Sequence, residues 1–391
     1  MHKSTWLQRL AACALLAGLA GAAMAQDAVK IGLILPMTGP FASTGKQIEA
    51  AVKLYVQRNG ATVAGRKIEV ILKDDGGVAD TTRRLAQELV VNDKVQFLAG
   101  FGLTPLALAT APIATQGKVP MIVMAAATSI ITEQSPFIAR TSFTLPQVAI
   151  GMADWAAKNK IRKVVSLVSD YGPGIDAENA FKGRFTAAGG QMLAELRVPM
   201  ANPDFAPFLQ RVRDAAPDAV FVFVPSGIGA SFAKQFSERG LDKSGIRLIG
   251  TGDVTDDDIL NRMGDVTLGV ITSHHYSAAH PSATNRAFVD AFTKSAQMRP
   301  NFMAVGGYDG MHLIYKALEA TKGATGGEAL LAAMKGMSWE SPRGPVTIDP
   351  QTRDIIQNVY IRKVEKTGDQ LYNVEFDTIP MVKDPVKAAK Q

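Results

Sequence analysis

Cysteine, histidine and long hydrophobic runs are scarce in this sequence. The 391 residues include a single cysteine, Cys13, and five histidines. One thiol cannot build the disulfide framework of a small secreted scaffold. With 47% hydrophobic and 20% charged residues, the composition is also unlike that of a disordered chain. At roughly 150 residues per domain, the length predicts two globular domains.

Clustered charge is missing as well. The 42 Lys and Arg against 36 Asp and Glu give a formal charge of +6. The basic residues never gather beyond pairs such as Arg83 and Arg84, and acidic residues lie among them. Because a nucleic-acid surface needs a basic stripe that follows the phosphates, we expect no nucleic-acid partner.

One long apolar stretch is present, and it lies at the N-terminus. Lys3 and Arg9 precede an Ala/Leu-rich run over residues 10–22, and Ala23 and Ala25 are the small residues of a cleavage site. This pattern predicts a secretory signal peptide over residues 1–25. A retained membrane anchor is the alternative, but a span needs roughly 20 apolar residues. We therefore expect an exported chain without an integral membrane segment or a cysteine.

Behind this leader, short apolar strands alternate with helices in two successive series. The first has strands at 29–35, 67–73, 95–99 and 119–124 and helices at 45–59 and 81–92; the second has strands at 163–168, 192–198, 219–224 and 246–250 and helices at 177–188 and 230–240. Strands that are apolar throughout are typical of parallel sheets covered on both faces. The pattern predicts an α/β fold with two doubly wound parallel-sheet lobes.

The remaining segment is too short for a third domain and should complete the two lobes. It contains a strand pattern at 269–275, helices at 285–297, 306–320 and 328–335, and strands at 345–348, 355–363 and 371–376. We expect lobe one to comprise residues 26–146 plus 276–350, and lobe two residues 147–275 plus 351–391. A hinge of several strands would then favour closure around the crevice between the lobes.

Enzyme motifs are only approximated. Residues 100–105 begin like a dinucleotide fingerprint, but Pro105 stands where the third glycine belongs. Residues 39–46 imitate a P-loop with one residue too many, and Gln47 replaces the Ser or Thr that binds magnesium. Residues 41–45 lack the first glycine of a nucleophile elbow. We interpret all three as turns between strand and helix, and expect neither enzymatic activity nor a cofactor.

The histidines do not form a recognisable metal motif. His274, His275 and His280 lie close together, but no cysteine or carboxylate occurs among residues 274–280. We expect them to be polar groups at a strand end and in the following loop, and no metal site.

Two loops of the first lobe suit an anion. Thr104, followed by Pro105, reads as a helix start, and residues 125–129 place hydroxyls beside three alanines. Small side chains give a ligand access to backbone N–H groups, and a helix N-terminus favours negative charge. These loops would hold a carboxylate without an arginine, unless they are ordinary helix caps. Tyr171 and Asp253 follow strands of the second lobe and would face them.

Seven segments, in their order along the chain, resemble those of the periplasmic leucine/isoleucine/valine-binding proteins of ABC uptake systems. They are KIGLILPMTGPFASTG, GLTP, AAATS, RTSF, SDYGPG, GTGD and GGYDGM, and they span essentially the whole mature chain. The resemblance implies a type I periplasmic binding fold, a location in the periplasm, and an inner-membrane ABC permease as partner.

The resemblance also implies a set of ligand contacts. Thr104, Ala126 and Thr128 would hold a carboxylate, and Tyr171 would form the wall of the other lobe. Asp253 stands where amino-acid binders hold the ammonium group. Phe41 and Tyr308 would line the pocket.

Two departures leave the ligand open between an amino acid and an aromatic acid. Residues 225–227 read PSG where amino-acid binders often present an aromatic contact, and SDYGPGIDAE and GTGDVTDDD look closer to a branch that binds hydroxybenzoates or phenylpropenoates. Asp253 would then pair with an ammonium or accept a hydrogen bond from a ligand hydroxyl. The expected function is delivery of a small carboxylate to a permease; a periplasmic sensor that presents its closed form to a signalling partner is the alternative.

Overall fold

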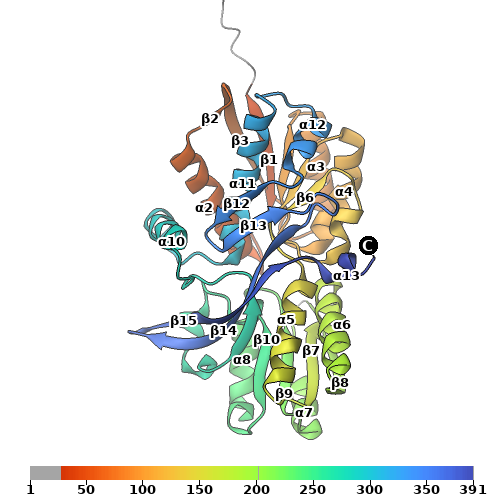
Figure 1. The fold of residues 1–391 in the computed structure, drawn as a ribbon, viewed down its shortest axis with the longest axis vertical. Helices are drawn as coiled ribbons and strands as arrows, with labels where there is room; N and C mark the ends of the chain where they lie inside the picture. The colour runs from red at the N-terminus through yellow and green to blue at the C-terminus, as the bar shows by residue number, and fades with distance from the viewer. Residues whose placement is uncertain (1–27, 201, 391) are drawn as a thin grey trace, which may run out of the picture.

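The computed structural model describes residues 28–200 and 202–390. The predicted signal peptide over residues 1–25 lies outside the described residues. The described chain forms two α/β lobes that follow one another along the long axis of the molecule (Figure 1). Two lobes, each built on its own sheet, confirm the predicted fold class.

Lobe one is built on a six-stranded sheet with the order β2-β3-β1-β4-β5-β6. Its strands are β1 (Val29–Leu35), β2 (Thr62–Val63), β3 (Arg66–Asp74), β4 (Phe97–Gly100), β5 (Met121–Val123) and β6 (Ile138–Arg140). All pairs are parallel except β2 with β3. The helices are α2 (Ala42–Asn59), α3 (Ala79–Val91) and α4 (Thr104–Gly117). β4 and β5 are buried at every position, which explains their uninterrupted apolar sequence.

Lobe two is built on a sheet of nine strands within the described residues. It runs β12-β13-β14-β11-β10-β9-β7-β8, with β15 paired to β14. The parallel part comprises β7 (Lys163–Ser169), β8 (Gln191–Val198), β9 (Ala219–Phe223), β10 (Arg247–Thr251) and β11 (Ile271–His274). The helices of this region are α5 (Leu145–Lys158), α6 (Gly172–Ala187), α7 (Ala206–Ala215), α8 (Gly229–Glu238) and the short α9 (Leu260–Met263).

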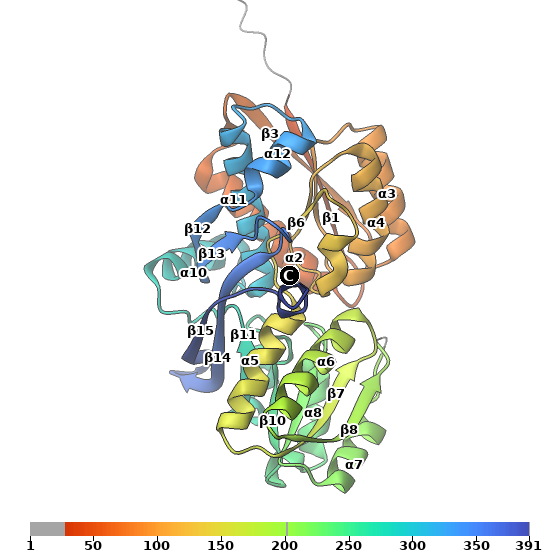
Figure 2. The same cartoon turned by 45° about the vertical axis from the view of Figure 1, so that its right-hand side comes forward.

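After β11 the chain returns to lobe one. Here α10 (Ala283–Ala296) and α11 (Phe302–Ala320) pack against α2, and α12 (Gly327–Met334) packs against α11. Next, β12 (Ser338–Ser341) pairs with β13 (Gly344–Ile348), and β13 pairs with β14, which joins this hairpin to the sheet of lobe two. The long β14 therefore connects the two lobes (Figure 2).

β14 (Ile355–Thr367) and β15 (Gln370–Val382) form an antiparallel hairpin longer than the predicted strands. Gly368, at φ +61°, supplies the left-handed residue of its turn. The second half of β15, residues 376–382, is largely exposed. Its sequence therefore lacks the apolar pattern by which a strand is recognised. The chain then ends beside the junction of the lobes with α13 (Pro385–Ala388) (Figure 1).

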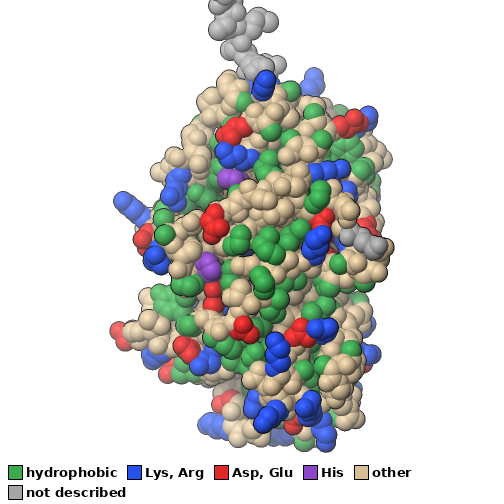
Figure 3. Space-filling view, viewed as in Figure 1, with side chains coloured by type: hydrophobic (Ala, Val, Ile, Leu, Met, Phe, Trp, Pro, Cys, Tyr) green, Lys and Arg blue, Asp and Glu red, His purple; other side chains and the backbone are tan. Residues whose placement is uncertain are grey.

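The surface agrees with the dispersed charge of the sequence. On the face shown in Figure 3, acidic side chains lie among the basic ones over both lobes. Over residues 28–200 and 202–390, none of the helices is both long and apolar enough to cross a membrane.

Candidate functional site

A cavity lies between the lobes, at the carboxyl ends of strands from both sheets. It encloses about 390 Å³, open solvent at its mouth included. Such a position is where doubly wound sheets bind their ligands. The residues that line it are Phe41, Thr44, Gly102, Leu103, Thr104, Ala125, Ala126, Ala127, Phe143, Leu145, Tyr171, Pro173, Phe223, Pro225, Ser226, Asp253 and Met303.

The lobe-one wall consists of two loops that are joined by a backbone hydrogen bond. Gly100, the last residue of β4, and Phe101, which follows it, have φ values of +109° and +67°. This left-handed turn places the carbonyl of Phe101 where it accepts a hydrogen bond from the N–H of Ala126 at 3.0 Å. A left-handed backbone conformation costs free energy in a phenylalanine. It persists only where the surrounding structure holds it, as these two loops do.

That hydrogen bond revises the role expected for Ala126. Ala126 lines the cavity, but its N–H already donates to the carbonyl of Phe101. Among the described residues, the N–H groups of Thr104 and Ala127 have no protein acceptor. Because Thr104 is the first residue of α4, its N–H also carries the positive end of the helix dipole. The N–H groups of Thr104 and Ala127 are therefore candidates for binding an anion, together with those of Gly102, Leu103 and Ala125, which also line the cavity without a protein acceptor.

Thr128 stands behind Thr104 and is absent from the lining. The two hydroxyl oxygens lie 2.9 Å apart, and both side chains are buried. One hydroxyl donates to the other, which leaves the second proton free to reach a ligand. Thr128 thus orients the hydroxyl of Thr104.

Aromatic rings from both lobes line the cavity. Tyr171 and Phe223 of lobe two are stacked, with their ring centroids 6.1 Å apart and their planes 25° apart. Phe41 and Phe143 line the cavity from the segments that follow β1 and β6. Burial raises the pKa of the Tyr171 phenol, so the ring is neutral at physiological pH. The cavity therefore offers stacking surface to a planar ligand.

Asp253 is the one charged residue among those that line the cavity. It follows β10, is 4% exposed, and accepts a hydrogen bond from the hydroxyl of Thr251 at 3.0 Å. Burial raises its pKa from an ordinary value of 3.8 to about 7, and the hydrogen bond from Thr251 and the charge of Arg362 only partly oppose this rise. A carboxylate in this position calls for a donor or a cation from the ligand.

The lobes touch each other around the cavity, as in a closed form. The hydroxyl of Ser43 in α2 donates to Asp258 of lobe two, and the N–H of Ser129 donates to Asp176 in α6 at 2.8 Å. Gly172 permits the approach of α6, because a Cβ there would lie 2.7 Å from the hydroxyl of Thr128.

Tyr308, which was expected to line the pocket, is not among the residues that line this cavity. This tyrosine lies in α11 and packs away from the cavity, with its ring centroid 4.9 Å from that of Tyr55 and 5.0 Å from that of Phe288. Met303, five residues earlier in the same helix, lines the cavity. With 3.6 residues per helical turn, Met303 and Tyr308 lie on different faces of α11. The motif GGYDGM does not show which of these faces points into the cavity.

Other lining residues were missed. Phe223 directly ends β9, and the strand-end rule could have identified it, whereas Phe143 and Leu145 follow a three-residue strand too short to recognise. Neither His274 nor His275 lines the cavity. Both imidazoles are fully buried without hydrogen-bond partners in the described chain and pack against Phe143 and Phe302.

Comparison with known proteins agrees with this architecture. The sequence profile of a family described as "Periplasmic binding protein" matches residues 28–369. The Leu/Ile/Val-binding protein homolog 6 of Brucella melitensis biotype 1 is 46% identical over 372 residues, which are 94% of this chain and 95% of the relative.

Two solved structures are similar throughout. A solute binding protein of an ABC transporter from Rhodopseudomonas palustris BisB5, in complex with 3,4-dihydroxybenzoic acid, is 66% identical with a TM-score of 0.91, and the match covers 93% of this chain and all of that one. Another from R. palustris, in complex with 4-hydroxybenzoate, is 41% identical with a TM-score of 0.90 and covers 94% of this chain and all of its own. The chain therefore belongs to the periplasmic binding protein family, as a solute-binding protein of the ABC-transporter type.

Proposed function

We propose that this protein captures a hydroxylated aromatic carboxylate in the periplasm and delivers it to an inner-membrane ABC permease. The predicted signal peptide supports export. The ligand would lie in the cavity between the lobes, with its carboxylate at the start of α4 and its ring hydroxyl at Asp253.

The observation that carries this proposal is the pairing of aromatic walls with a single buried carboxylate. Phe41, Phe143, Tyr171 and Phe223 provide the surface on which a benzene ring packs. None of the lining residues is a lysine, arginine or histidine, so the ligand carboxylate would rely on backbone N–H groups, the Thr104 hydroxyl and the helix dipole. A ring hydroxyl would supply the hydrogen bond that Asp253 needs.

The bound ligands of the similar solved structures support the same chemistry. The protein that is 66% identical holds 3,4-dihydroxybenzoic acid, and the one that is 41% identical holds 4-hydroxybenzoate. Both ligands carry a carboxylate and a ring hydroxyl at opposite ends, which matches the proposed contacts with α4 and Asp253.

A branched-chain amino acid is the second candidate ligand. It is favoured by the relative named as a Leu/Ile/Val-binding homolog and by Asp253, which could pair with an ammonium group. The two candidate ligands need different properties of Asp253. An ammonium group needs its negative charge, whereas a hydroxyl needs only an oxygen that accepts a hydrogen bond.

Titration calorimetry distinguishes the two candidates. We expect micromolar binding of 3,4-dihydroxybenzoate or 4-hydroxybenzoate, about −8 kcal/mol, and no heat with leucine, isoleucine or valine. Exchange of Asp253 for Asn keeps an acceptor oxygen, so it should weaken the hydroxybenzoates only moderately, whereas it would abolish binding of an amino acid. Failure of every hydroxylated aromatic acid to bind would exclude the proposed ligand class.

A further inference from the structure

A buried arginine outside the cavity holds the loop of residues 125–129, referred to here as the 125–129 loop. Arg140, in β6, is fully buried. Its guanidinium donates to the carbonyls of Ala126 at 3.3 Å, Thr128 at 2.7 Å and Ser129 at 3.3 Å. One side chain thus fixes three carbonyls of the loop, and with them the direction of its N–H groups.

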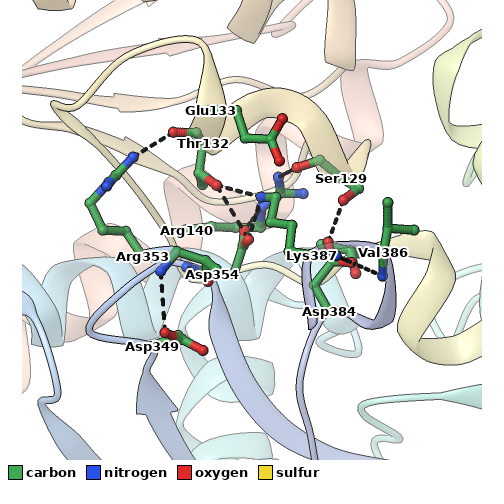
Figure 4. A network of polar contacts seen from close by, with 12 residues as sticks. Ser129, Thr132, Glu133, Arg140, Asp349, Arg353, Asp354, Asp384, Val386 and Lys387 are labelled. Atoms are coloured by element: carbon green, nitrogen blue, oxygen red, sulfur yellow. Dashed lines mark hydrogen bonds and ion pairs between the residues drawn. The ribbon is translucent and has the colours of Figure 1, made fainter. Parts of the chain in front are cut away.

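The charge of Arg140 is balanced by a group that the C-terminus shares. Asp354, between β13 and β14, lies 2.9 Å from Nε of Arg140 and 2.5 Å from Nζ of Lys387 in α13. The ammonium of Lys387 also donates to the hydroxyl of Thr132 at 2.5 Å, just beyond the loop. Figure 4 shows these groups converging between the C-terminal segment and lobe one.

A buried lysine is costly unless its charge is compensated. The side chain of Lys387 is 4% exposed and that of Asp354 is 2% exposed. Burial lowers the pKa of the Lys387 ammonium, and the charge of Asp354 opposes that effect. Lys390, three residues later in the same segment, makes an ion pair with Glu133 at 3.0 Å, but its side chain is 61% exposed. The two lysines therefore differ in burial and not in charge.

A second tether runs directly from the C-terminal segment to the loop. Asp384 caps the N-terminus of α13 and accepts hydrogen bonds from the N–H of Val386 at 2.9 Å and from the hydroxyl of Ser129 at 2.5 Å. The N–H of Ser129 meanwhile donates to Asp176 of lobe two. Ser129 is therefore bonded both to the C-terminal segment and to the opposite lobe.

We propose that residues 384–388 are a positioning element of the ligand site. Lys387, through Asp354 and Arg140, and Asp384, through Ser129, hold the 125–129 loop so that its N–H groups meet the carboxylate of the ligand. Lys387 and Asp384 are not in the cavity lining, and they act through the loop. The ligand class used in the test rests on the proposed function.

The test uses the full mature chain with Lys387→Met and the matched control Lys390→Met. Affinities are measured for 4-hydroxybenzoate and for 4-hydroxybenzamide, whose neutral amide replaces the carboxylate. Lys387→Met should weaken the carboxylate about tenfold and the amide less than threefold, whereas Lys390→Met should change neither. Lys387→Arg, which keeps the positive charge, should restore part of the lost affinity.

Hydrogen exchange of the ligand-free protein gives a second readout. Amides of residues 125–133 should exchange faster in Lys387→Met, while those of β4 and β5 stay protected. If Lys387→Met does not fold, Ser129→Ala cuts only the second tether and should give the same pattern with a smaller effect.

Three outcomes would overturn the proposal: unchanged exchange over residues 125–133, equal weakening of acid and amide, or a lower melting temperature with unaltered affinity. If the wild-type protein binds neither ligand, the proposed ligand class fails, and hydrogen exchange alone still decides the positioning role.

Discussion

Discrimination between benzoate and 4-hydroxybenzoate should depend on pH through Asp253. In the closed cavity, burial raises the pKa of this carboxyl to about 7. In an open form, water reaches the carboxylate and its ordinary pKa near 3.8 applies. When the protein closes around benzoate, which has no hydroxyl, Asp253 must therefore either bind a proton or be buried with its negative charge.

The size of the effect follows from the two pKa values. A difference of about three pH units corresponds to about 4 kcal/mol, or roughly a thousandfold in affinity. This is an upper bound, because the cavity relaxes around a buried charge. A raised pKa in the closed form means that affinity for benzoate is complete below pH 4 and is lost as pH rises towards 7. The hydroxyl of 4-hydroxybenzoate donates to the charged carboxylate, so its affinity should change little.

Calorimetry measures this proton linkage directly. Titrations between about pH 5.5 and pH 8 keep the carboxyl groups of both ligands ionised. In two buffers with different ionisation enthalpies, benzoate should bind together with nearly one proton near pH 5.5, and 4-hydroxybenzoate with almost none. The affinity for benzoate should fall at least tenfold from about pH 5.5 to pH 8. Asp253→Asn should remove both the proton uptake and the pH dependence of this affinity.

Identical proton uptake for the two ligands would refute the reasoning. So would an Asp253→Asn variant that keeps the pH dependence of benzoate binding, because the proton would then bind to another group.

The remaining predictions concern stability and closure. Gly306→Ala should destabilise the protein by about 1–3 kcal/mol in urea unfolding, because its Cβ would lie 2.1 Å from the carbonyl oxygen of Met124. Gly183→Ala, in α6 with no atom within 4 Å of the new Cβ, should stabilise it by about 0.5–1 kcal/mol; effects of the same sign would contradict this pair. Burial lowers the pKa of His274 and His275, so the melting temperature should fall as pH drops below about 6.5. The fall should be less steep in His275→Gln. An equally steep fall in that variant would show that the pH dependence arises from other groups. Ser43→Ala removes the hydrogen bond to Asp258 across the lobes and should weaken ligand binding about two- to fivefold, at about 0.5–1 kcal/mol, while unaltered affinity would show that this contact contributes nothing to closure.

The sequence predicted the parallel strands and several positions in the cavity lining for the same physical reason. Strands buried on both faces must be apolar, and ligands bind where such strands end. Thr104, Tyr171 and Asp253 lie in the segments that follow β4, β7 and β10, so a correct strand assignment was sufficient to bring them together. Five of the seven expected residues line the cavity, and Thr128 supports one of them from behind.

What the sequence did not reveal depends on backbone conformation and on distant parts of the chain. Phe101 adopts a left-handed conformation, and its carbonyl accepts a hydrogen bond from the N–H of Ala126. The sequence does not predict this conformation, because phenylalanine rarely adopts it. Met303 reaches the cavity because α11 returns to lobe one after the parallel strands of lobe two. The pairing of Arg140, Asp354 and Lys387 spans most of the chain, and a charged residue in a sequence does not show whether it will be buried.

The placement of polar groups on opposite lobes suggests how binding is converted into a signal. Thr104 and Ala127 would hold a carboxylate on lobe one, while Asp253 requires a donor on lobe two. A ligand shifts the equilibrium towards the closed form only by the difference between its affinities for the closed and open forms. A compound with a carboxylate alone would bind lobe one similarly in both forms and, where Asp253 is charged, could not offset the burial of that charge. A compound with a carboxylate and a hydroxyl at opposite ends gains its second contact only on closure. Selectivity and closure would thus have one cause, whether the closed form is read by a permease or by a signalling partner.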